Sequence, residues 1–142
     1  MNQDMLELVR AKDICVMGTR GSDCPHLSLM AYVRDSETGC FILYTHPDTG
    51  KWENLRADPR LSLLIDSRDD DLPGNRKQAK ALTITAVHQA TDAQEENRLR
   101  EIFLLRHPHM LEFIEHGAVM IRAEPRSYKL LTGIDRIDFE EV

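Results

Sequence analysis

The sequence predicts a mainly β, α+β fold, with six or seven strands in an antiparallel barrel and a few flanking helices. Short apolar and β-branched runs recur along the chain, and most are joined by connections of hairpin length. Helical patterns do not alternate regularly with these runs, which disfavours a parallel sheet. The 142 residues suit one core, so we expect a single domain over residues 1–142. Closing the sheet would also remove its exposed edges.

The first half of the chain is expected to hold two short helices and four strands. Apolar residues fall on one stripe between Asn2 and Lys12, which predicts an amphipathic helix. A second helix is expected at 51–57, ending before Asp58-Pro59 because proline disfavours a helical residue before it. The runs that predict strands are 14–19, 26–33, 40–45 and 61–66.

The strand at 26–33 has two different faces. Alternation places four apolar residues on one face, which we expect to cover the core: Leu27, Leu29, Ala31 and Val33. The other face is mixed, and we expect it to meet something more polar: His26, Ser28, Met30 and Tyr32.

The second half begins with a charged loop over residues 67–80, whose length predicts a functional or mobile segment. The alternation at 81–87 predicts a strand. Asp92 is a candidate helix cap with Glu95 as its capping-box partner, and that helix should end at His107-Pro108. A short helix at 110–115 and two strands at 118–123 and 127–134 complete the prediction.

Composition excludes several functional classes. The net charge of −6 disfavours non-specific nucleic-acid binding, which needs a basic surface. No apolar run reaches the length of a membrane span, and the first residues lack a signal-peptide pattern, so we expect a cytoplasmic protein that does not bind membranes. Three unpaired cysteines predict reduced thiols rather than disulfides or a zinc site.

Two side chains near the middle of the chain suit phosphate chemistry. The Thr45 hydroxyl ends a strand and Lys51 begins a helix, whose free amides also favour anions. Lysines at helix starts are common, so these residues alone are also compatible with a solvated Lys51.

The order and spacing of several short motifs resemble the pyridoxamine 5'-phosphate oxidase-like family of FMN-binding split β-barrels. The resemblance is firm over residues 10–66. The matching segments are Pro25-His26-Leu27-Ser28, Tyr44-Thr45, Lys51, Asn54-Leu55 and Asp58-Pro59-Arg60-Leu61.

This resemblance implies a homodimer with FMN at its interface. The flavin ring would lie along five consecutive residues: His26, Leu27, Ser28, Leu29 and Met30. Four residues would hold the ribityl phosphate: Tyr44, Thr45, Lys51 and Asn54. The second subunit would contribute part of the charged loop, with Gln78 and Ala79 as candidates.

The later half is similar to the haem-utilisation branch of the split barrels, around Arg106-His107-Pro108 and Lys129–Gly133. That branch usually has Gly-Phe-Gly where this chain has Gly133-Ile134-Asp135. The chain also lacks the Arg- and Trp-bearing segment with which pyridoxamine phosphate oxidases hold their substrate, so vitamin B6 oxidation is not favoured.

No residue stands out as an obligatory acid, base or nucleophile. His26 is a candidate donor to the ring or to substrate. His109, Glu112 and His116 share a helix face, but a polar surface explains them better than a metal, and no metal site is predicted. The resemblance implies an FMN-dependent oxidoreductase passing electrons from a nicotinamide-type donor to a small-molecule acceptor. The alternative is a non-catalytic flavin- or haem-binding protein.

Overall fold

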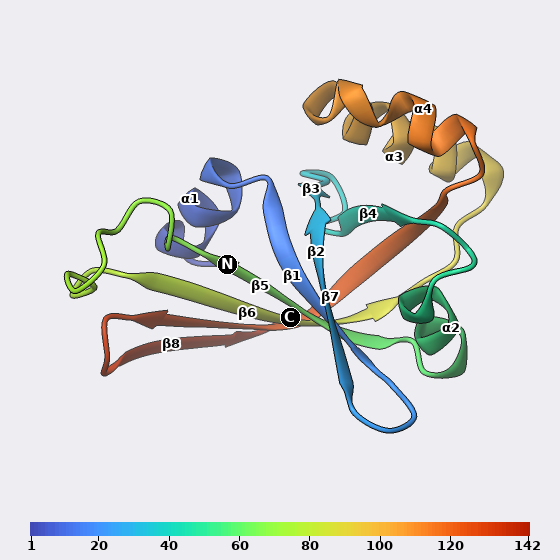
Figure 1. Ribbon diagram of the computed structural model, residues 1–142. Coiled ribbons are helices and arrows are strands. Elements are labelled where there is room, and N and C mark those ends of the chain that lie inside the picture. The colour runs from blue at the N-terminus through green and yellow to red at the C-terminus, as the bar shows by residue number, and fades with distance from the viewer.

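A curled antiparallel sheet dominates the computed structural model, which describes residues 1–142 (Figure 1). Its strand order is β2-β1-β5-β6-β7-β4-β3, and β8 pairs with β7. The strands are β1 Ile14–Arg20, β2 Pro25–Ala31, β3 Val33–Arg34, β4 Phe41–Thr45, β5 Arg60–Asp66, β6 Lys80–His88, β7 Val119–Thr132 and β8 Arg136–Glu141. The predicted mainly β split barrel with flanking helices is confirmed.

Four α-helices flank this sheet. They are α1 Gln3–Ala11, α2 Gly50–Ala57, α3 Ala93–Arg106 and α4 Leu111–Glu115, with a 3₁₀ turn at Pro108–Met110 before α4. Side-chain caps set three of the starts, because the oxygens of Asn2, Thr49 and Asp92 accept backbone N–H groups that would otherwise lack partners. None of the helices is long and apolar enough to cross a membrane.

The barrel closes where β2 bends into β3 at Tyr32. The first part of this segment pairs with β1 and the last part with β4, so it joins the two ends of the sheet. The Tyr32 N–H donates to the Asp13 carbonyl at 2.9 Å, and its hydroxyl lies 2.7 Å from the Val9 carbonyl oxygen. His107 lies 2.8 Å from the Tyr32 carbonyl through Nε2, which ties the end of α3 to the same bend.

Apolar side chains form two cores, one on each side of β4. Twenty buried residues fill the barrel, and seven more lie between β4, β7 and the α3–α4 segment. Phe41 and Leu43 face the barrel, whereas Ile42 and Tyr44 face the helices. All five residues of β4 are therefore buried, as expected for a strand covered on both faces.

The structure reverses the predicted faces of β2. Met30 and Tyr32, assigned to the mixed face, are buried in the barrel, whereas Leu27 and Leu29 are 70% and 74% exposed on its outside. Ala31 and Val33 also lie outside, against the second core. Alternation separates two faces of a strand but does not say which one turns inward, and here the larger side chains fill the barrel.

The C-terminal part also differs from the prediction. Residues 118–123 and 127–134 do not form separate strands, because β7 runs unbroken through Pro125. A register shift leaves Arg126 without a partner in β6, and this bulge accommodates a proline that has no N–H to donate. The eighth strand, β8, was not predicted because four of its six residues are charged.

Ion pairs attach the outlying segments to the barrel. Lys12 bridges Asp69 and Asp70 of the 67–79 loop, at 2.7 Å each. Arg98 of α3 binds the buried carboxylate of Asp35 at 2.7 Å and Glu95 at 2.7 Å. Burial alone would raise the pKa of Asp35, but hydrogen bonds from Arg98 and Thr38 outweigh it and hold the pKa below its ordinary value.

We predict that Arg98→Ala lowers the free energy of unfolding at pH 7, since the carboxylate of Asp35, which is 2% exposed, is left without its cation. Because the pKa of Asp35 is lowered in the folded state, the pair stabilises the fold above about pH 4 and its contribution falls as the pH drops further. Urea denaturation of wild type and variant at pH 7 and pH 3 measures both effects.

Arg100→Ala on the same helix is the control, because Arg100 makes no ion pair. An equal loss of unfolding free energy in the two variants would contradict a stabilising Arg98–Asp35 ion pair. A loss in Arg98→Ala that is as large at pH 3 as at pH 7 would also contradict it.

Candidate functional site

The candidate site is built around the start of α2. Thr49 caps this helix, and its hydroxyl lies 3.0 Å from that of Thr45 at the end of β4. The N–H groups of Gly50 and Lys51 in the first turn have no hydrogen-bond partner within the chain. A helix start with two free donors is a binding position for an anion.

The β1–β2 hairpin reaches the same place. His26 lies beside Gly50, where an added Cβ would come 3.8 Å from His26 Cε1. Asn54 of α2 donates from Nδ2 to the Thr19 hydroxyl at 3.1 Å, and Thr19 is the partner of His26 in the β1–β2 ladder. The structure thus brings His26 beside the helix that carries Lys51 and Asn54.

Lys51 supplies the positive charge of this cluster. It is half-buried, and no carboxylate lies within 4 Å of its ammonium group. An ammonium group, two backbone N–H groups and an imidazole form a donor set that suits a phosphate. The residues present therefore fit the ribityl phosphate that the sequence assigned to them.

The predicted ring-binding segment of β2 passes beside this cluster. Leu27 and Leu29 are exposed, Ser28 is half-buried and Met30 is buried in the barrel. Only the backbone of Met30 is therefore accessible to a ligand lying along the outside of β2.

Two other groups of predicted residues lie apart from α2. Tyr44 is buried against Phe103 of α3, at 4.9 Å between ring centroids, and its hydroxyl has no partner. Burial raises the pKa of Tyr44 to about 12. Gln78 and Ala79 lie in the 67–79 loop, at the other end of β5 from α2 (Figure 1).

The histidines are dispersed. His107 is buried, with its Nε2 on the Tyr32 carbonyl and its ring against Phe103. His116 is exposed, and its Nδ1 lies 4.0 Å from Glu112. The His, Cys, Asp and Glu side chains form no cluster of three or more that could hold a metal ion.

Trp52 and His88 form a contact beneath α2 that the sequence analysis missed. Their rings meet edge to face, with centroids 5.5 Å apart. The backbone N–H of Arg122 donates to His88 Nδ1 at 3.3 Å. Burial lowers the pKa of His88 because the protonated ring would lose water contacts. Their separation of 36 positions hides this pairing from any local pattern.

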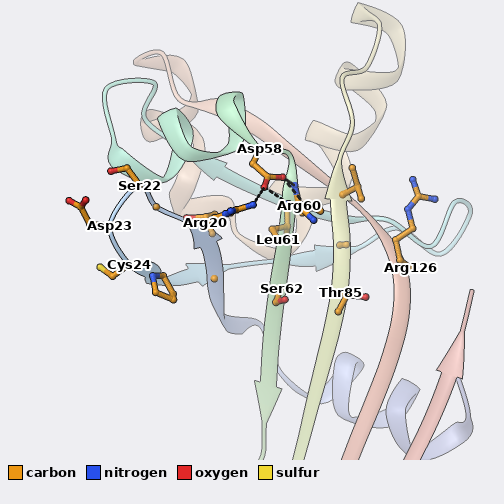
Figure 2. A pocket seen from close by; sticks show the side chains of 16 residues that line it. Arg20, Ser22, Asp23, Cys24, Asp58, Arg60, Leu61, Ser62, Thr85 and Arg126 are labelled. Carbon is orange, nitrogen blue, oxygen red and sulfur yellow. Dashed lines mark hydrogen bonds and ion pairs between the residues drawn. The ribbon is translucent and has the colours of Figure 1, made fainter.

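A groove of about 830 Å³ opens next to the cluster, between the β1–β2 turn and strands β5, β6 and β7 (Figure 2). Arg20 and Arg60 converge on Asp58, at 3.6 and 2.7 Å. Arg126 lies on β7, beyond Thr85 of β6. No local sequence pattern indicates this groove, because its arginines come from three strands and line one groove only through strand pairing and the bulge.

Comparison with known proteins assigns the family. The profile of the pyridoxamine 5'-phosphate oxidase family matches residues 1–123. The chain belongs to this family. Pyridoxamine 5'-phosphate oxidase-like proteins generally bind a flavin, although some proteins of this fold bind haem. No curated protein sequence matches the chain significantly.

Solved structures share the fold at low sequence identity. A haem-binding protein from Mycobacterium smegmatis is 16% identical with a TM-score of 0.83, over 99% of this chain and 59% of that protein. The haem storage protein HutZ from Vibrio cholerae is 15% identical with a TM-score of 0.73, over 92% of each chain. An FAD-binding protein from Mesorhizobium loti is 15% identical with a TM-score of 0.72, over 97% of this chain and 93% of that protein.

We predict that the fluorescence of Trp52, the single tryptophan, falls as the pH is lowered, with a midpoint below 6.5. A protonated imidazole quenches an adjacent indole, and burial shifts the protonation of His88 below its ordinary pKa. A fluorescence titration of wild type and His88→Gln measures this, and the variant should lose the transition. The same transition in His88→Gln would refute the pairing.

Proposed function

We propose that this protein is an FMN-dependent oxidoreductase that acts as a homodimer and transfers electrons from a nicotinamide-type donor to a small acceptor. The observation that carries the proposal is the phosphate-type donor set at the start of α2, next to the exposed segment of β2, in a chain of the pyridoxamine 5'-phosphate oxidase family.

The start of α2 would hold the phosphate. The free N–H groups of Gly50 and Lys51 point along the helix axis toward an anion, and the Lys51 ammonium adds an unpaired charge. Thr45 and Thr49 orient this turn through their hydroxyl contact, and Asn54 anchors α2 to β1 through Thr19. A phosphate would therefore meet donors that are already held in place.

The outer side of β2 would hold the ring system. Leu27 and Leu29 offer apolar contact, and Ser28 offers a polar group between them. When bound, FMN supplies the redox centre that accepts a hydride from a reduced nicotinamide and returns the electrons to an acceptor. His26 belongs to β2, and its side chain lies beside the start of α2. From there it could donate a hydrogen bond to the ring or to a substrate.

A second copy of the chain would cover this face. Ile14, Leu27 and Leu29 are exposed on adjacent strands β1 and β2, and contiguous exposed apolar side chains mark interfaces. Gln78 and Ala79 lie at the opposite end of β5 from Lys51 in the same chain, a separation of about 20 Å for seven strand residues. If these two residues contact a flavin held at α2, they do so from a second copy of the chain.

We predict that Lys51→Ala weakens FMN binding ten- to a hundredfold, since a charge-assisted hydrogen bond contributes about 1.5–3 kcal/mol. Trp52, in the first turn of α2, provides the readout through quenching of its fluorescence by bound flavin. Arg56→Ala, which removes a cation from the last turn of the same helix, should bind FMN as wild type does.

If Lys51→Ala binds FMN with wild-type affinity, Lys51 does not hold the phosphate. A wild-type protein that binds no FMN but shows a Soret band with haem would replace the flavin proposal by the haem alternative. Flavin binding without turnover by any reduced nicotinamide would leave a non-catalytic flavin carrier.

We predict that Leu29→Glu converts a dimer into a monomer, because a charge would be buried at the centre of the proposed interface. Sedimentation velocity with and without FMN measures the mass, and FMN affinity should fall together with dimerisation. Leu105→Glu is the control, since Leu105 is 86% exposed on α3 and belongs to neither β1 nor β2. A monomeric wild type, or a dimeric Leu29→Glu variant, would overturn the interface.

A further inference from the structure

The groove of Figure 2 continues directly from the proposed flavin strand. Pro25, next to His26, lies in its wall, and so does Gly18, the ladder partner of Leu27. A Cβ on Gly18 would come 3.4 Å from Leu27 Cδ2, so a larger residue there would crowd this junction. A ligand in the groove would therefore adjoin a ring lying along β2.

Three arginines and two aspartates line the groove, Arg20, Arg60 and Arg126 against Asp23 and Asp58, so the lining carries a net positive charge although the protein has a net charge of −6. Arg20 and Arg60 share the single carboxylate of Asp58, whose pKa is lowered chiefly by its hydrogen bond from Arg60. One carboxylate neutralises one guanidinium, so the two arginines together retain one positive charge and free N–H donors. Arg20 is 73% exposed in its side chain and is free to turn toward a ligand.

Arg126 reaches the opposite wall through the bulge in β7. Thr85 pairs with Ser127 and Ala86 with Pro125, so Arg126 is the residue that the ladder skips. Bulges re-aim side chains and are frequent beside functional sites. Arg126 contacts Glu124 at 3.1 Å, but its side chain remains half-exposed and lines the groove.

Hydroxyl groups lie between the two walls. Ser62 of β5 and Thr85 of β6 are neighbours across the ladder, and the Thr85 hydroxyl contacts that of Ser127 at 2.5 Å. With about 830 Å³, the groove is within the range of pockets that take nucleotide-sized ligands. Strands β5 and β6 separate the walls, with about 14 Å between the backbones of β1 and β7, so the long side chains of Arg20 and Arg126 would extend over these hydroxyls to hold one diphosphate between them.

We propose that this groove binds the diphosphate of the nicotinamide dinucleotide that reduces the flavin, with Arg20 and Arg126 as its ligands from opposite walls. The inference rests on the proposed function for the role of the ligand, but the groove itself is formed without flavin. The residues that would select the dinucleotide therefore lie outside the group of residues proposed to bind phosphate at the start of α2.

ADP is the probe, because it carries the diphosphate without a redox group. Titration calorimetry of the FMN-loaded protein should show ADP binding that weakens at least tenfold in Arg20→Ala and in Arg126→Ala. In the same variants the KM for NADH should rise by a similar factor, with kcat and FMN affinity near wild type. Arg10→Ala, which removes an exposed arginine from α1, should change neither quantity.

Asp58→Asn removes a negative charge from the groove, so it should strengthen ADP binding where the arginine variants weaken it. The amide keeps an oxygen for the Arg60 backbone N–H, which donates to Asp58 Oδ1 at 3.1 Å, but releases both guanidinium groups from a competing anion. ADP should therefore bind several-fold more tightly, an effect that damage to the fold would not produce. Weaker or unchanged binding in Asp58→Asn would count against the proposal.

The flavin-free protein separates the two proposals. If FMN does not bind but ADP still binds in an Arg20- and Arg126-dependent way, the groove assignment holds and the flavin proposal fails. If FMN binds but the two arginine variants bind ADP as wild type does, the groove assignment is overturned. Equal competition by inorganic phosphate and ADP at the same concentration would also overturn it, because it indicates an unspecific anion site.

Discussion

The bend at Tyr32 is the constraint on which the rest of the molecule depends. Its N–H, carbonyl and hydroxyl groups bind Asp13, His107 and Val9, so one residue joins α1, β1 and the end of α3. The bend lets one segment pair with β1 and then with β4, which closes the sheet. A residue that must bond in three directions and also fill the barrel has few substitutes.

Closure in turn determines where the functional groups lie. Once β2 is held beside β1, His26 reaches the start of α2, and the Asn54–Thr19 hydrogen bond holds α2 against the same hairpin. The Thr45–Thr49 contact holds the start of α2 against the end of β4. The proposed phosphate site therefore lies where three strands and one helix converge, and the barrel core supplies its rigidity.

Irregular positions carry much of the remaining chemistry. The bulge at Arg126 places a guanidinium opposite Arg20, and Gly21 permits the tight β1–β2 turn, because a Cβ there would lie 2.4 Å from the Cys24 carbonyl oxygen. A regular β6–β7 ladder without the bulge would have placed the Arg126 side chain elsewhere. The outer face of β2, with Leu27 and Leu29, is an apolar surface that the barrel leaves without a partner, and Ile137 and Phe139 of β8 form another.

Most helices and strands follow from local signals in the sequence, because periodicity, caps such as Asp92 and breaks such as Asp58-Pro59 act over a few residues. The order of the motifs along the chain also led to the proposal that His26, Lys51 and Asn54 share one site, and the structure places His26 beside the helix that carries the other two. Other features follow from the folded chain as a whole: Leu27 faces outward, β7 continues through Pro125, and Arg20 and Arg126 line one groove. Those outcomes depend on strand pairing and on competition for space in the barrel, which no local pattern encodes.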